Sequence, residues 1–173
     1  GYSGARLTTV TDPAGRMIRY TYSGPLLTGV TDTTGKTTTI GYTPTNRLKS
    51  ISDANNHKFV DNTYNSDGRV VEQRDAQGNM TTFSYDLDAR RTVVTDPLGH
   101  TMTYTYDAAY RIVQETDAEG KSIQYQYDTS NNRTRTTDKR GNTTYSEYDS
   151  RGNVTLVTDA LGNVPLAASE ADR

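Results

Sequence analysis

The sequence predicts an all-β protein, an antiparallel meander of about sixteen short strands built from two-strand repeats of about 21 residues. Three observations carry this prediction. Aspartate, glycine and tyrosine recur in fixed columns, Tyr (13 residues) and Thr are abundant, and apolar and polar residues alternate between the turns. Tyr and Thr fit a pleated, half-covered surface, and no window shows a helical period, so strands are favoured throughout.

The first column is a turn. Its aspartate recurs every 20 to 22 residues, and the residue three positions later is glycine, except once, where it is Asn56. Asp caps the first position of a β-turn, and Gly or Asn tolerates a positive φ at the fourth. The predicted structural turn residues are Asp12, Gly15, Asp32, Gly35, Asp53, Asn56, Asp75, Gly78, Asp96, Gly99, Asp117, Gly120, Asp138, Gly141, Asp159 and Gly162.

The second column is tyrosine. From Tyr22 onward each column tyrosine stands 10 or 11 residues after a turn aspartate and opens a second turn. A third column, mostly aliphatic, falls five residues before each aspartate: Leu7, Leu27, Leu48, Val70, Arg91, Ile112, Arg133 and Val154. Three registers held over eight copies indicate a repeat array. The predicted structural repeat tyrosines are Tyr2, Tyr22, Tyr42, Tyr64, Tyr85, Tyr106, Tyr127 and Tyr148.

Each repeat reads as an outgoing and a returning strand. Residues 102–106 and 123–127 alternate large apolar or aromatic residues with Thr or Gln, the pattern of a strand with one covered face. The returning strands alternate less cleanly. Their apolar positions often fall three apart, as in Leu48 and Ile51, which predicts a bulge near the turn.

Composition excludes several classes of protein. The absence of cysteine excludes disulfide scaffolds, thiolate nucleophiles and Cys-ligated metal sites. A net charge of −2, with Lys and Arg spread along the chain, gives no footprint for nucleic acid. No apolar run approaches the roughly 18–20 residues of a membrane-spanning helix. We therefore expect neither a nucleic-acid partner nor a membrane span.

The predicted sheet leaves apolar surface to be covered. Sixteen strands about 4.8 Å apart would make a sheet roughly 75 Å wide, and open sheets rarely exceed about ten strands without curling or packing on another layer. One face would carry the tyrosines and their aromatic neighbours, with no helix to cover it. Its two unpaired edges would accept further repeats, partner strands or a second copy of the chain.

The repeat unit resembles the YD repeat of the RHS/YD-repeat family, which includes bacterial Rhs polymorphic toxins, insecticidal toxin-complex components and teneurins. The resemblance lies in Tyr148-Asp149 through Gly152 and Val154, followed by Thr158-Asp159 and Gly162, and it covers about residues 1–163. It implies a spiralled sheet that curls as part of a hollow shell, enclosing a C-terminal toxin in the bacterial members.

The sequence also departs from the family pattern. Tyr22, Tyr42 and Tyr64 lack the following aspartate, and nothing matches the family's delivery region, self-cleaving plug or toxin. The chain begins within a repeat, so we expect a fragment of a longer array. Pro165 interrupts the last expected strand. We therefore expect an array of about eight YD repeats over residues 1–163 and an irregular tail or linker over residues 164–173.

No residue is predicted to be catalytic, to bind a cofactor or to ligate a metal. The aspartate column invites a calcium ladder, but a 21-residue unit with one Asp per turn does not match nine-residue calcium repeats, and turn capping is favoured. His57 and His100 both stand four residues after a turn aspartate and read as exposed flanking residues. The tyrosine column could bind sugars or peptides, but its recurrence at one turn-entry position favours cross-strand packing.

Two functions remain open. The favoured one is a non-enzymatic structural segment of a YD-repeat β-shell that encloses or displays another domain. The resemblance implies that this domain is a C-terminal toxin. The alternative is an extracellular carbohydrate- or receptor-binding repeat module. The implied partners are further YD repeats of the same protein and the toxin domain, besides self-association through sheet edges. The resemblance implies a secreted or cell-surface location, and no cofactor is expected.

Overall fold

The computed structural model describes residues 1–164, and all of its regular elements there are β-strands. The chain divides into two compact units, residues 1–83 and the residues from 84 onward, with β10 (Met80–Asp86) lying across the division. The remaining strands of the first unit are β1 (Tyr2–Ser3), β2 (Arg6–Leu7), β3 (Thr9–Thr11), β4 (Met17–Ser23), β5 (Leu26–Thr31), β6 (Thr37–Tyr42), β7 (Leu48–Ser52), β8 (Lys58–Tyr64) and β9 (Val70–Arg74).

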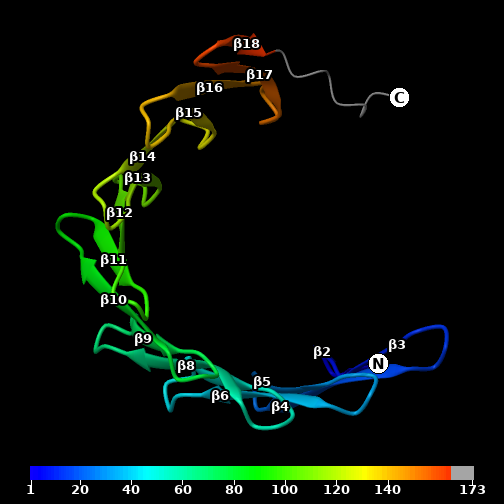
Figure 1. Cartoon of the computed structure of the whole chain (residues 1–173). Helices are drawn as coiled ribbons and strands as arrows, with labels where there is room; N and C mark the ends of the chain where they lie inside the picture. Colours follow the sequence, from blue (N-terminus) through cyan, green and yellow to red (C-terminus); the bar gives the residue numbers. More distant parts are fainter. Residues whose placement is uncertain (165–173) are drawn as a thin grey trace. The chain divides into compact units, whose positions relative to one another are not determined.

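The second unit continues the same succession of short strands (Figure 1). Its strands are β11 (Arg91–Thr95), β12 (Thr101–Tyr106), β13 (Ile112–Thr116), β14 (Ser122–Tyr127), β15 (Arg133–Thr137), β16 (Thr143–Tyr148), β17 (Val154–Asp159) and β18 (Gly162–Val164).

The topology is a meander. Over residues 1–164 the main sheet has 16 strands, β3 to β18, in chain order, and β1 and β2 form a separate two-stranded ladder. Within each unit every paired strand runs antiparallel to its neighbour, as the short connections require. The prediction of an all-β antiparallel meander of about sixteen strands is therefore confirmed. The expected tail lies, from residue 165 onward, outside the described residues.

A register shift stands directly before a column tyrosine in repeat after repeat. In the second unit Thr105 pairs with Gln114 while Tyr106 pairs with Ile112, so Val113 is the extra residue of a β-bulge. The same shift precedes Tyr22, Tyr42, Tyr64, Tyr127 and Tyr148. The bulge predicted between Leu48 and Ile51 is confirmed, because Tyr42 pairs with Leu48 and Gly41 with Ser50.

No hydrophobic side chain among the described residues is fully buried, and Asn62, 4% exposed, is the buried polar residue there. Strand β4 shows the reason, since it alternates half-buried and exposed positions along its length, with Ile18, Tyr20 and Tyr22 half-buried. One sheet layer covers only what neighbouring strands can cover. Within residues 1–164 there is no helix, and hence none that could cross a membrane.

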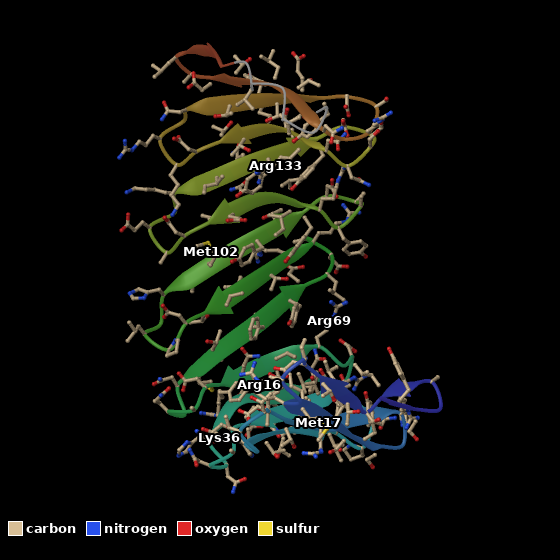
Figure 2. The ribbon with its side chains drawn as sticks, turned by 90° about the vertical axis from the view of Figure 1, so that its right-hand side faces the viewer. Arg16, Met17, Lys36, Arg69, Met102 and Arg133 are labelled. Carbon is tan, nitrogen blue, oxygen red and sulfur yellow. The ribbon has the colours of Figure 1, made fainter. Side chains whose placement is uncertain are left out.

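The two edges of the sheet in the second unit carry different turns. Met102 on β12 lies just after an Asp-x-x-Gly turn, whereas Arg133 on β15 lies just after a Tyr-Asp turn (Figure 2). The two kinds of turn alternate because each strand reverses the direction of the one before. Each repeat therefore contributes one turn to either edge.

Candidate functional site: the turn and tyrosine columns

The turn aspartates hold their loops by the same set of hydrogen bonds. Asp96 Oδ1 accepts the backbone N–H groups of Leu98 at 2.9 Å and His100 at 2.8 Å, and the Gly99 N–H donates to the Asp96 carbonyl at 3.0 Å. Asp12, Asp32, Asp53, Asp75, Asp117 and Asp138 accept the same two side-chain bonds, and Asp159 accepts the first of them, from Leu161.

The fourth position of this turn has a positive φ. Asn56, which stands where the other repeats have glycine, adopts φ 65° and so supplies the left-handed geometry that glycine supplies elsewhere. Six glycines of the column share this geometry, with φ of 79–89°: Gly15, Gly35, Gly78, Gly99, Gly120 and Gly141. Gly162 differs, because its φ is 139° and it pairs with Asp159 in the ladder between β17 and β18.

The second carboxylate oxygen of the aspartate faces the side chain four residues later. His100 Nδ1 lies 2.9 Å from Asp96 Oδ2 and His57 Nδ1 lies 3.1 Å from Asp53 Oδ2, and both histidine side chains are 67% exposed. The His100 side chain and backbone N–H groups lower the pKa of Asp96, because hydrogen bonds stabilise the ionised carboxylate. The pKa is lowered for the same kind of reason at Asp12, Asp32, Asp53, Asp75, Asp107, Asp117, Asp128, Asp138 and Asp149.

The second turn, which follows the column tyrosine, repeats this construction. Asp107 Oδ1 accepts the N–H groups of Ala109 at 2.8 Å and Arg111 at 3.0 Å, and Asp128 and Asp149 do the same in their turns. Where the sequence lacks this aspartate, Thr43 Oγ1 or Asn65 Oδ1 accepts the corresponding N–H. These capping residues were not among the predicted site residues, although the Tyr-Asp dipeptide was the available signal.

Four residues of the second turns are not glycine yet have a positive φ: Asn46 at 61°, Arg90 at 48°, Tyr110 at 60° and Asn131 at 67°. At Tyr110 this conformation is costly, because a bulky residue with a Cβ atom is disfavoured in this region of backbone space. Its side chain is 79% exposed.

Hydroxyls of the tyrosine column join several repeats to the repeat before. Tyr127 donates its hydroxyl to the carbonyl of Ile112 at 2.9 Å, and Ile112 belongs to the third, mostly aliphatic column. The same bond joins Tyr22 to Leu7, Tyr42 to Leu27, Tyr64 to Leu48 and Tyr148 to Arg133, at 2.5–2.9 Å. Tyr85 and Tyr106 are half-buried at the equivalent positions of β10 and β12, and Tyr2 is 74% exposed.

The ladder explains why a hydroxyl is needed there. Strands β13 and β14 pair only as far as Gln114 with Gln124, so the ladder stops before it reaches Ile112. Buried or half-buried carbonyls require a hydrogen-bond donor. The hydroxyl of Tyr127 supplies it, which phenylalanine could not do.

Arginine side chains cover several of these rings. The guanidinium carbons of Arg6, Arg47 and Arg111 lie 5.5, 5.8 and 4.8 Å from the ring centroids of Tyr22, Tyr64 and Tyr127. These are cation–π distances. Sequence reasoning missed these arginines, although each stands directly before a residue of the third column.

Arg111 connects two successive turns on the same edge. Its Nη2 lies 2.7 Å from Asp107 Oδ2, and its Nη1 donates to the Asp128 carbonyl at 3.1 Å and to Asn131 Oδ1 at 3.0 Å. The planar guanidinium suits this role because it presents donors in several fixed directions. Neighbouring repeats are therefore tied through one side chain that also stacks on Tyr127.

The opposite edge has a comparable link. Lys139 Nζ lies 2.7 Å from Asp117 Oδ2, which joins the Asp117 turn to the next turn of the same kind, and the Asp117 carboxylate raises the pKa of Lys139. These two residues line an open hollow of about 550 Å³, together with Asp96, His100 and Met102. Within residues 1–164, no three acidic or histidine side chains are grouped as a metal site would need.

The chain was compared with protein families and known structures. The teneurin YD-shell family model matches residues 33–160. A comparison with curated proteins found no match.

Solved structures of toxin complexes share the fold. The Photorhabdus luminescens Tc holotoxin pore structure, a TccC3 D651A mutant, is 14% identical with a TM-score of 0.61, over 86% of this chain and 9% of that one. The TcdB2–TccC3–Cdc42 structure is 14% identical with a TM-score of 0.61, over 83% of this chain and 9% of that one. The TcdB2–TccC3 structure is 14% identical, TM-score 0.62, over 86% and 10%.

The chain thus spans about a tenth of the length of the toxin-complex chains it resembles. The family match covers most of the residues in which the turn and tyrosine columns recur. Periodicity, fold and family match agree, and the chain belongs to the teneurin YD-shell family.

Proposed function

We propose that the chain is a non-enzymatic structural segment of a YD-repeat β-shell that encloses or displays another domain, a C-terminal toxin in a longer protein. Membership of the YD-shell family supports the structural part. The toxin part is supported by solved structures of similar fold, among them a Tc holotoxin pore and a TcdB2–TccC3 structure.

The observation that carries the proposal is the absence of a buried hydrophobic side chain among the described residues. Tyr104, Tyr125 and Ile123 alternate with polar residues on their strands and remain only half-buried. A domain that folds around its own hydrophobic core normally buries such residues. A wall segment leaves them for further repeats or for enclosed material to cover.

The columns fit this structural role. The hydroxyls of column tyrosines such as Tyr127 donate hydrogen bonds to backbone carbonyls, and arginines lie over several of the rings. The turn aspartates accept backbone N–H groups of their own loops. We therefore propose that the turn and tyrosine columns serve the array and are not a ligand site, which disfavours the alternative of a glycan-binding module.

The same proposal gives the partners of the chain, the bounds of its repeat array and its location. The partners are further YD repeats of the same protein and the enclosed or appended toxin domain. The array occupies residues 1–163, followed by a tail or linker, and the protein is secreted or displayed on the cell surface, in keeping with its family.

Dilution of the isolated chain tests the structural part. We expect self-association in analytical ultracentrifugation, or rapid amide exchange in edge strands such as β3, because unpaired edges and half-covered aromatics favour association or opening. A monomer that persists at high dilution, with slowly exchanging amides throughout, would count against a wall segment.

The coding sequence on both sides tests the enclosure. YD units that continue for hundreds of residues and end in an unrelated C-terminal domain would support it. Start and stop codons close to Gly1 and Arg173 would exclude an enclosed toxin and leave a self-assembling module.

A further inference from the structure

The face of the second unit opposite the tyrosine column carries a polar stripe around Arg135 on β15. Side chains alternate along β14, so Gln124 and Gln126 lie on the face opposite to Tyr125 and Tyr127. Arg135 pairs with Gln126 on one side and with Tyr145 of β16 on the other, which places all three on the same face.

This stripe is hollowed. An open pocket of about 250 Å³ is lined by Gln114, Gln124, Gln126, Arg135 and Thr137, with Val113 and Tyr125 completing it. Its polar lining is amide, hydroxyl and guanidinium, without a carboxylate.

The guanidinium of Arg135 has a buried donor without a partner. Its Nε atom is buried and has no hydrogen-bond acceptor among the described residues. A buried donor without an acceptor is costly and calls for a ligand or water. Arg111, by contrast, has Asp107, the Asp128 carbonyl and Asn131 as partners.

The chemistry around Arg135 matches a carboxylate. A guanidinium presents a planar fork of N–H donors that fits the two oxygens of a carboxylate. The side-chain amides of Gln124 and Gln126 line the same hollow and can add neutral donors. Glu147, the acidic residue nearest along β16, makes no ion pair with Arg135 in the described structure.

The neighbouring aromatic residue favours a protein ligand over an acidic sugar. Sugars use an open aromatic face for stacking, but the guanidinium carbon of Arg135 lies 5.7 Å from the ring centroid of Tyr145 and occupies one face of it. We propose that the Arg135 hollow, formed by Arg135, Gln114, Gln124, Gln126 and Thr137, binds the side-chain carboxylate of a Glu or Asp in a partner polypeptide. This inference does not depend on the enclosure of a toxin.

Arginine-detected NMR on the full 173-residue chain tests the inference directly. With ¹⁵N-arginine labelling, the Nε–Hε signal of Arg135 is followed while the peptide Ac-Gly-Glu-Gly-NH₂ is added to tens of millimolar. We expect a saturable shift of this signal, whereas Ac-Gly-Gln-Gly-NH₂, which differs only in its neutral amide, should cause none. Selective labelling keeps the signal readable in a dimer as well as in a monomer.

Variants locate the site. Arg135→Gln should weaken binding of the Glu peptide at least about tenfold, as expected for loss of a hydrogen-bonded charge. Arg135→Lys keeps the charge but loses the fork and should also weaken it. Arg151→Gln, at an exposed turn, is the matched control and should leave the affinity unchanged. Circular dichroism checks that each variant folds. If a variant does not fold, the comparison of the Glu and Gln peptides on the wild-type chain decides whether the hollow binds a carboxylate.

Three outcomes would overturn the proposal. One is an Arg135 signal that does not move with the Glu peptide. Another is an equal shift with the Gln peptide, which would remove the carboxylate from the argument. The third is tighter binding of glucuronate than of the Glu peptide, which would make the hollow a site for acidic sugars.

Discussion

Replacing Tyr127 by Phe isolates the link between successive repeats. The variant removes the hydroxyl that donates to the Ile112 carbonyl at 2.9 Å but keeps the ring on which Arg111 stacks at 4.8 Å. A protein hydrogen bond contributes about 0.5–1.5 kcal/mol net, and Ile112 and Tyr127 are half-buried, so we expect a loss of about 1 kcal/mol.

The consequence should be local. Each unit of a repeat array contacts only its neighbours, so the loss should raise amide exchange in β13, β14 and β15 about fivefold and leave distant strands unchanged. Native-state hydrogen exchange followed by NMR or mass spectrometry measures this. A fall in melting temperature of about 2–4 °C should accompany it where unfolding is cooperative.

Tyr110→Phe is the matched control, because it removes the same atom from a side chain that is 79% exposed and whose hydroxyl bonds to no residue in 1–164. It should change stability by less than about 0.5 kcal/mol. Equal effects of the two variants would show that the Tyr127 hydroxyl contributes nothing to repeat coupling. A uniform effect over the whole chain would refute nearest-neighbour coupling.

Three further predictions concern the turns. Gly99→Ala should lower the free energy of unfolding by about 1–2 kcal/mol through its φ of 86° alone. Gly68→Ala should lower it by about 0.5–1 kcal/mol more, because its Cβ would meet the Arg47 guanidinium and push it off the Tyr64 ring. Denaturant titration of both variants measures the difference, and equal losses would contradict the steric part. Tyr110→Gly should stabilise by about 0.5–1 kcal/mol, because it relieves a φ of 60° at a cost in unfolded-state entropy, and a lower melting temperature would be the opposite result. Stability should fall in acid, because the pKa of turn aspartates such as Asp96 and Asp138 in the folded chain lies below the ordinary 3.8. Their contribution to stability is complete above that pH and is lost as pH falls through the lowered pKa values. A pH series of melting curves measures this loss, and Asp138→Asn should make the pH dependence weaker.

The sequence alone predicted the features that depend on neighbouring residues. The capping bonds of Asp96 reach only two and four residues along the chain, so aspartate followed by glycine at the fourth position is enough to predict the turn. The alternation within residues 123–127 predicts a strand for a similar reason, and the meander follows because short turns join only antiparallel strands. Even the bulge near Leu48 was visible as a break in that alternation.

The tertiary structure decided what those columns do to one another. Tyr127 and Ile112 are 15 residues apart, and their bond exists only because the bulge and register bring that carbonyl to the end of the ladder. The stacking of Arg111 on Tyr127 and the unpaired Nε of Arg135 depend on the same cross-strand placement. Residue spacing along a chain cannot supply this information, because which side chains meet is set by pairing between strands, and a shift of one residue would move every side chain to the opposite face.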